Sequence, residues 1–226
     1  MPNDAGDKAG IPHYPDAMSE SHPTAVPRRA AIFGGSFDPV HRGHLAMAQR
    51  AREVAGIDRV LFMPAAVSPF KKGTVASGPQ RSTMLGIALA ESGLDWAEVS
   101  DFELNRPAPS YSWETANHFS KAFPGTEWFW ILGTDQWEQI DRWAGPEILR
   151  HLLHFLVFTR EGEPVRDRPG WRNTAISFTH PASSTAIRAD LDGHHDWLAP
   201  GVFHYCREQG LYSGSSIRPF TPPPPR

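Results

Sequence analysis

The sequence predicts an α/β fold, with an open, mostly parallel sheet that carries helices on both faces in a Rossmann-like arrangement. Short apolar runs of the length of buried strands recur along the chain. Segments with helical periodicity separate these runs, which is typical of a parallel sheet with crossover helices. Near the start, a strand, a helix and a second strand fit within about thirty residues, the size of a βαβ unit.

The expected elements follow one another in the order that this fold class requires. A glycine at position 56 should close the first helix, and Pro109, Ser110 and Ser112 are placed to cap the helix that includes 116–122. Buried strands are expected at 30–33, 59–63, 128–132, 154–158 and 175–180, with a half-buried strand at 96–104. Helices are expected at 44–55, 80–91, 147–154, from 183 onward and at 200–209, and a further helix should include 116–122.

Composition divides the chain into one domain and two tails. Its 226 residues, of which 40% are hydrophobic, can bury one substantial core. Residues 1–28 are rich in Pro, Asp, Gly, Ser and His without hydrophobic periodicity, which predicts a disordered N-terminal extension. Residues 29–213 should form a single domain, and 214–226 a Pro-rich disordered tail.

The global charge of the chain points to no polyanionic partner. A formal net charge of -3 gives no electrostatic footprint for nucleic acid, so any anion must bind to a local patch. The single cysteine, Cys206, excludes an internal disulfide framework and fits a reducing compartment. Because no apolar run could span a bilayer and no signal-peptide layout opens the chain, we expect a cytoplasmic protein without membrane partners.

The segment 30–47, AAIFGGSFDPVHRGHLAM, has the layout of an anion-binding site. A Gly-Gly turn lets backbone N–H groups approach a ligand, and the following helix N-terminus adds its positive dipole end. His41 and His44 stand three residues apart at its mouth, where both rings can face one phosphate chain.

The segment 181–191, PASSTAIRADL, is the second informative motif. Ser183 and Ser184 offer hydroxyl caps for a helix, Thr185 lies in its opening turn, and Arg188 can reach back toward the same anion site. A capped surface helix with an incidental arginine would have the same pattern, so this motif alone leaves both interpretations open.

Two further positions are candidates for nucleotide contacts. Lys71, next to Lys72 in a loop after a strand, is a candidate phosphate ligand, although surface lysines are commonly only solvated. Asp135 follows Gly133 at the end of a buried strand, where ligands bind in open parallel sheets. Its carboxylate could accept hydrogen bonds from ribose hydroxyls, cap the next helix, or do both.

Together, His41-Arg42-Gly43-His44 and SSTAIR at 183–188 resemble the two signature motifs of the nucleotidyltransferase superfamily whose first motif has the form H-x-G-H. The resemblance is greatest to the bacterial nicotinate-nucleotide adenylyltransferases and extends from Ala30 to Tyr212. Further landmarks that resemble this family are Pro64, Lys71, Arg81 with Met84, PSYSWET at 109–115, LGTD at 132–135, Trp143 and GLY at 210–212.

The resemblance implies a fold of the nucleotidyltransferase type and transfer of AMP from ATP to nicotinate mononucleotide, releasing pyrophosphate. It implies Mg²⁺ carried on the phosphates and no metal site built by the protein. The implied catalytic residues are His41, His44, Lys71 and Arg188. The implied ATP-binding residues are Gly34, Gly35, Ser36, Phe37, Gly133, Asp135, Ser183, Ser184 and Thr185. The implied acceptor-binding residues are Tyr111, Ser112 and Trp143, whose indole could stack on the pyridine ring or belong to the core.

The chain departs from the family pattern at four positions. Phe70 and Gln80 stand where the family often has histidine, so the phosphate contacts of those histidines are in question. Ser112 replaces a threonine and keeps a hydroxyl, and Glu114 replaces an aspartate and keeps a carboxylate.

Other functions remain open at this stage. The pairs His41/His44, His151/His154 and His194/His195 have metal-ligand spacing, although no cysteine or carboxylate cluster completes a set. The enzyme could act on nicotinamide mononucleotide or another phosphate acceptor, and a non-catalytic nucleotide-sensing module could share the fold. A homo-oligomer is compatible with the sequence.

Overall fold

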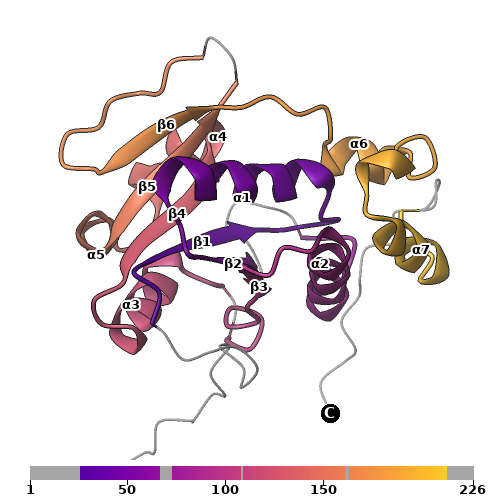
Figure 1. Ribbon diagram of the computed structural model, residues 1–226, viewed down its shortest axis with the longest axis horizontal. Coiled ribbons are helices and arrows are strands. Elements are labelled where there is room, and N and C mark those ends of the chain that lie inside the picture. The colour runs from indigo at the N-terminus through magenta and orange to yellow at the C-terminus, as the bar shows by residue number, and fades with distance from the viewer. Residues whose placement is uncertain (1–25, 67–72, 108, 161–162, 213–226) are drawn as a thin grey trace, which may run out of the picture.

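The computed structural model describes residues 26–66, 73–107, 109–160 and 163–212 (Figure 1). At its centre lies a six-stranded sheet with the strand order β3-β2-β1-β4-β5-β6. All neighbouring strands pair in parallel, which confirms the predicted fold class. The strands are β1 (Arg29–Gly35), β2 (Arg59–Pro64), β3 (Ala97–Val99), β4 (Glu127–Gly133), β5 (Leu153–Thr159) and β6 (Asn173–Ser177).

Helices cover both faces of the sheet, with α1 on one side and α3 on the other (Figure 1). Gly56, with φ of 61°, closes α1 in the left-handed conformation, as predicted. The α-helices are α1 (Arg42–Ala55), α2 (Gly78–Ser92), α3 (Ser112–Ala122), α4 (Thr134–Trp137), α5 (Pro146–Leu152), α6 (Ser184–Ala189) and α7 (Pro200–Glu208). Two 3-10 helices are η1 (Ile140–Arg142) and η2 (His195–Trp197).

The sheet separates two hydrophobic cores, because successive side chains of a strand point to opposite faces. In β1, Ala31 and Phe33 belong to the core that α1, α2, α6 and α7 cover. Ala30 and Ile32 belong to the core on the other face, with residues of α3, α4 and α5. Strands buried on both faces read as continuous apolar runs, which is why the sequence located β1, β2, β4 and β5 well.

The two edge strands differ from the sequence expectation. β3 spans only Ala97–Val99, not 96–104, and residues 102–105 form a turn instead. β6 runs from Asn173 to Ser177, so it begins and ends earlier than the expected 175–180. Each is an edge strand and pairs with a single neighbour, β2 or β5.

The structure describes only a few residues near the two expected domain boundaries. The expected N-terminal extension lies outside the described residues except for 26–28, and the tail at 214–226 lies outside them entirely. The carbonyl of Pro27 accepts from the Thr126 hydroxyl at 2.7 Å, and the Arg28 carbonyl accepts from the Glu127 N–H at 2.9 Å. Within the described ranges, every helix is too short or too polar to cross a membrane.

Candidate active site

The site predicted from the sequence lies where the strand order reverses, between β1 and β4. The chain runs from β1 outward to β2 and β3, then returns to β4 on the other side of β1. In open parallel sheets, ligands bind beyond the carboxyl ends of the strands at such a point. Gly34 and Gly35 end β1, and Gly133 ends the adjacent β4, so these three glycines lie at the same edge of the sheet.

His41 and His44 lie together at the start of α1. The N–H of His41, the N-cap residue, donates to Nδ1 of His44 at 3.2 Å, and the two rings stack with centroids 3.7 Å apart. Because Nδ1 of His44 accepts, its neutral ring carries the proton on Nε2. No acidic side chain occupies the first turn of α1, so the N-terminal N–H groups keep their attraction for anions.

A third imidazole, His180, lies beside these two and was not identified from the sequence. A Cβ atom placed on Gly43 would lie 3.0 Å from Nδ1 of both His41 and His180, so these nitrogens are at most about 6 Å apart. Burial, and secondarily the charge of His180, lower the pKa of His41 to about 4, which keeps His41 neutral at physiological pH. His180 precedes a proline in the loop between β6 and α6, and no local pattern marks it as part of the site.

The two sequence motifs meet in space, and Figure 1 shows α6 beside the beginning of α1. The Ser184 hydroxyl donates to the Pro39 carbonyl at 2.9 Å, and Arg188 Nη1 donates to the Asp38 carbonyl at 2.7 Å. Arg188 Nη2 also donates to the Thr185 hydroxyl at 3.2 Å. The SSTAIR segment therefore braces the loop that leads from β1 into α1.

Only one of the two expected hydroxyl caps is present at α6. The Ser183 hydroxyl accepts from the Ala186 N–H at 3.4 Å, as predicted. The Ser184 hydroxyl does not cap the helix, because Ser184 is already its first residue, and it donates to the Pro39 carbonyl.

Arg81 connects the loop that follows β1 with the loop that follows β2. The side chain is 1% exposed and donates to the carbonyls of Ser36 and Ala65, each at 2.7 Å. Since these carbonyls follow β1 and β2, one guanidinium joins the ends of both strands. The preceding Gln80 accepts from the Ser77 N–H at 2.9 Å in a capping box at the start of α2. The glutamine at this position therefore has a structural role.

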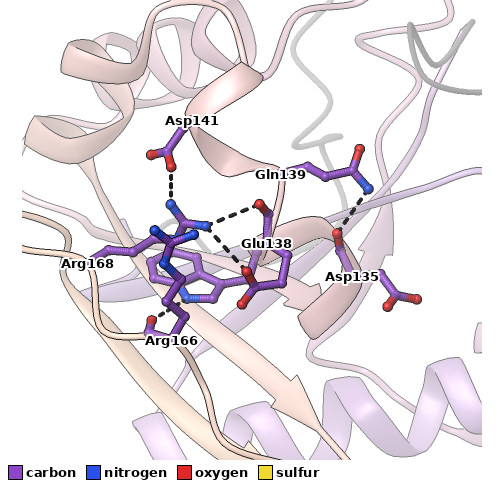
Figure 2. Close-up of polar contacts among 7 residues, drawn as sticks. Asp135, Glu138, Gln139, Asp141, Arg166 and Arg168 are labelled. Atoms are coloured by element: carbon purple, nitrogen blue, oxygen red, sulfur yellow. Dashed lines mark hydrogen bonds and ion pairs between the residues drawn. The ribbon is translucent and has the colours of Figure 1, made fainter.

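Asp135 does not cap α4, so that part of the expectation is wrong. The N-cap of α4 is Gly133, and Asp135 lies exposed in the first turn. Its backbone carbonyl accepts from the Gln139 side chain at 3.2 Å. In Figure 2 the Asp135 carboxylate points away from Arg168 and its partner Asp141. A contact between the Asp135 carboxylate and a ribose stays a prediction.

Arg168 anchors the segment that follows β4 (Figure 2). Its guanidinium, 5% exposed, donates to the Glu138 carbonyl at 3.1 Å and pairs with the Asp141 carboxylate. The Trp137 indole N–H donates to the Arg166 carbonyl at 2.9 Å. These contacts attach α4 and η1 to the loop before β6 and so fix the position of the chain just before Trp143.

The structure brings the two predicted acceptor segments together. A Cβ on Gly145 would lie 2.7 Å from Cγ of Trp113, so the first turn of α3 packs directly on the chain after Trp143. Tyr111 is 37% exposed, while Ser112 and Trp143 are partly buried. Trp143 also packs edge-on against Trp130, with centroids 6.0 Å apart. It therefore borders the core while keeping part of its surface accessible.

The expected capping of α3 by Pro109, Ser110 or Ser112 is wrong. The helix begins at Ser112, its N-cap is Tyr111, and no side chain of the N-cap makes a capping hydrogen bond. The helix does include 116–122, as expected.

Some expected site residues lie outside the described part of the chain. Lys71, Lys72 and Phe70 are among them. Among the residues that are described, no group of three or more His, Cys, Asp and Glu side chains could hold a metal ion. Of the histidine pairs considered above, His194 and His195 contact the backbone carbonyls of Asp190 and Asp192 at 2.9 and 2.8 Å.

Comparison with known proteins relates the chain to a known family. Residues 32–190 match the cytidylyltransferase-like family model. The chain is 38% identical to a Methylacidiphilum infernorum protein over 81% of this chain and 92% of that one. It is 36% identical to an Opitutus terrae protein over 83% of this chain and 99% of that one. Both relatives carry the name "Probable nicotinate-nucleotide adenylyltransferase".

A solved structure supports the fold independently of sequence. Nicotinic acid mononucleotide adenylyltransferase of Plasmodium falciparum, complexed with NaAD, superimposes with a TM-score of 0.69 at 17% identity. The match covers 81% of this chain and 97% of that one. From the family model and the curated relatives, the chain belongs to the cytidylyltransferase-like nucleotidyltransferases and, within them, to the nicotinate-nucleotide adenylyltransferase family.

Proposed function

We propose that this protein transfers AMP from ATP to nicotinate mononucleotide, forming nicotinate adenine dinucleotide and pyrophosphate, a step of NAD biosynthesis. The observation that carries the proposal is the meeting of the two motifs at the reversal of strand order. Ser184 and Arg188 hydrogen-bond the loop that leads to His41 and His44. Together these groups surround the edge of the sheet where nucleotides bind in this fold class.

The chemistry requires positioning and charge stabilisation more than proton transfer. The attacking group is a phosphate monoester with a second pKa of about 6, so it is already largely dianionic at neutral pH. No general base is needed. The site must instead hold two mutually repelling anions in line and stabilise charge that develops on the α-phosphate and the leaving pyrophosphate.

The residues at the start of α1 suit that task. The first turn of α1 carries no acidic side chain, so its backbone N–H groups can receive phosphate oxygens. The backbone N–H groups of 34–37 would add to them. His44 presents a proton on Nε2, and neutral His41 adds a second imidazole donor. Arg188 has N–H groups beyond the two used within the protein, and Lys71 would supply a further cation.

The implied Mg²⁺ fits this site as a companion of the substrate. The carboxylate of Asp38, on the loop before His41, already accepts from Val75, Ala76 and Tyr212. Among the described residues, no group of three or more His, Cys, Asp and Glu side chains could hold a metal ion. Mg²⁺ commonly keeps several waters and binds largely through substrate phosphates. When bound to ATP it would neutralise part of the phosphate charge.

The acceptor would bind between the start of α3 and Trp143. The accessible part of the Trp143 indole can stack on a pyridine ring, and Ser112 with nearby backbone N–H groups can donate to a nicotinate carboxylate. Tyr111, which is substantially exposed, borders the same place.

A comparison of acceptors tests the proposal. Purified protein with ATP and Mg²⁺ should release pyrophosphate much faster with nicotinate mononucleotide than with nicotinamide mononucleotide or phosphopantetheine. An equal or reversed preference would refute the acid acceptor. No turnover with any acceptor, together with retained ATP binding, would favour a nucleotide-sensing module instead.

A further inference from the structure

The carboxylate of Asp38, in the loop between β1 and α1, accepts three hydrogen bonds. Asp38 is 5% exposed, and its Oδ2 accepts from the Val75 N–H at 2.8 Å. Its Oδ1 accepts from the Ala76 N–H at 3.0 Å and from the Tyr212 hydroxyl at 2.6 Å. A buried carboxylate is retained in an apolar surrounding only when donors of this kind compensate its lost hydration.

Tyr212 reaches this loop from the far end of the sequence. It follows α7, is 6% exposed, and belongs to the core cluster that also contains Phe37, Ala76 and Leu211. Its backbone has φ of 59°, which is costly for a residue with a side chain. Burial, and then the charge of Asp38, raise the pKa of the Tyr212 hydroxyl, so the phenol remains a donor at every physiological pH.

The other side of the same loop is fixed through its backbone. Arg188 and Ser184 donate to the carbonyls of Asp38 and Pro39, and Arg81 donates to the carbonyl of Ser36. In contrast, the Tyr212 hydroxyl, from the segment after α7, donates to the side chain of Asp38. The loop leads directly into His41 and the first turn of α1.

We propose that Tyr212 is a positioning residue of the active site, whose hydroxyl holds Asp38 and thereby the loop that presents His41 and His44 to the phosphates. The proposal rests on the adenylyl transfer proposed above. Tyr212 touches no substrate in this mechanism. It acts by keeping the donors at the start of α1 where charge develops in the transition state, and misplacement by about 1 Å can cost about 10²-fold in rate.

The test replaces only the hydroxyl. Tyr212→Phe keeps the ring in the core and leaves Oδ1 of Asp38 with the Ala76 N–H alone. With ATP, Mg²⁺ and nicotinate mononucleotide, kcat and kcat/KM should fall together by about tenfold, while the KM for ATP changes less than about twofold. Equal decreases in kcat and kcat/KM indicate that the variant has lost an interaction made only in the transition state.

Two controls separate positioning from general packing. Tyr205→Phe removes a phenol of α7 that makes no side-chain hydrogen bond within the described residues, and should leave kcat unchanged. Leu211→Ala weakens the same core next to Tyr212 without touching Asp38. Assayed well below its melting temperature, it should keep kcat within about twofold of the parent.

A double-variant cycle connects the effect to Asp38. In an Asp38→Ala background, Tyr212→Phe should lower kcat by less than about twofold, because the hydroxyl has lost its partner. The inference is overturned if Tyr212→Phe retains full kcat, if Leu211→Ala loses as much, or if the Tyr212 and Asp38 effects multiply. Failure of the parent protein to turn over would instead refute the proposed function, so the two failures are distinguishable.

Discussion

The imidazoles of His41 and His44 stack with their planes 23° apart and their centroids 3.7 Å apart at the first turn of α1. The backbone N–H of His41 donates to Nδ1 of His44, and the ring of Phe37 packs edge-on against His44 with centroids 5.1 Å apart. His44 is therefore held in one orientation, with the proton of its neutral ring on Nε2.

From this relationship we predict that His44→Ala lowers kcat by about 10² or more, the effect of removing a transition-state donor. Steady-state kinetics with ATP and nicotinate mononucleotide measure it. The matched control is His195→Ala in η2, whose ring contacts the backbone of its own segment, and its kcat should match the parent. An increase confined to the KM for ATP would show that His44 contributes uniform binding instead.

Gly43 allows the imidazoles to approach α1. Gly43→Ala would place a Cβ 3.0 Å from Nδ1 of both His41 and His180, so the rings must move, and we expect kcat to fall at least tenfold in a folded protein. Gly86→Ala is the control, since nothing lies within 4 Å of a Cβ there. Lying inside α2, it should stabilise the protein by roughly 0.5–1 kcal/mol without altering kcat. Equal activities of the two variants would contradict close packing at Gly43.

The buried His41 should make stability depend on pH. Its pKa of about 4, against an ordinary 6.5, means that the unfolded chain binds more protons than the folded one between these values. The contribution of His41 to the free energy of unfolding is therefore fully present above pH 6.5. It is lost as the pH falls through 4, and the total decrease is roughly 3 kcal/mol. Urea unfolding at pH 7.5 and 4.5 should show a larger loss for the parent than for His41→Asn. Equal losses of stability in the two proteins would mean that folding does not lower the pKa of His41.

Arg81 should be a major contributor to stability. Arg81→Met keeps the length of the side chain but leaves the Ser36 and Ala65 carbonyls without their donors, and we expect a loss of about 2–4 kcal/mol. Denaturant midpoints at unchanged m-value measure it. Arg50→Met, which removes an exposed ion pair with Glu53, should change stability by less than about 0.5 kcal/mol. Similar losses in both variants would contradict a special role for Arg81.

The central strands could be located from sequence because both of their faces are buried. Continuous apolar runs at β1, β2, β4 and β5 result directly from two cores on opposite sides of the sheet. The edge strands β3 and β6 were located less well, since each is shaped by one neighbour. Helix starts were predicted two residues late at α1 and α2, which begin at Arg42 and Gly78 with polar or glycine residues that carry no apolar periodicity.

The sequence by itself determined the fold class, the two signature motifs and the family, because each depends on residues close together in the chain. Tertiary structure decided the remaining features. It placed His180 beside His41, joined Arg81 to the ends of two strands, and brought Tyr212 within 2.6 Å of Asp38, 174 positions earlier. Such contacts depend on how the strands and helices pack, and a buried hydrogen bond between distant residues leaves no periodic pattern in either segment.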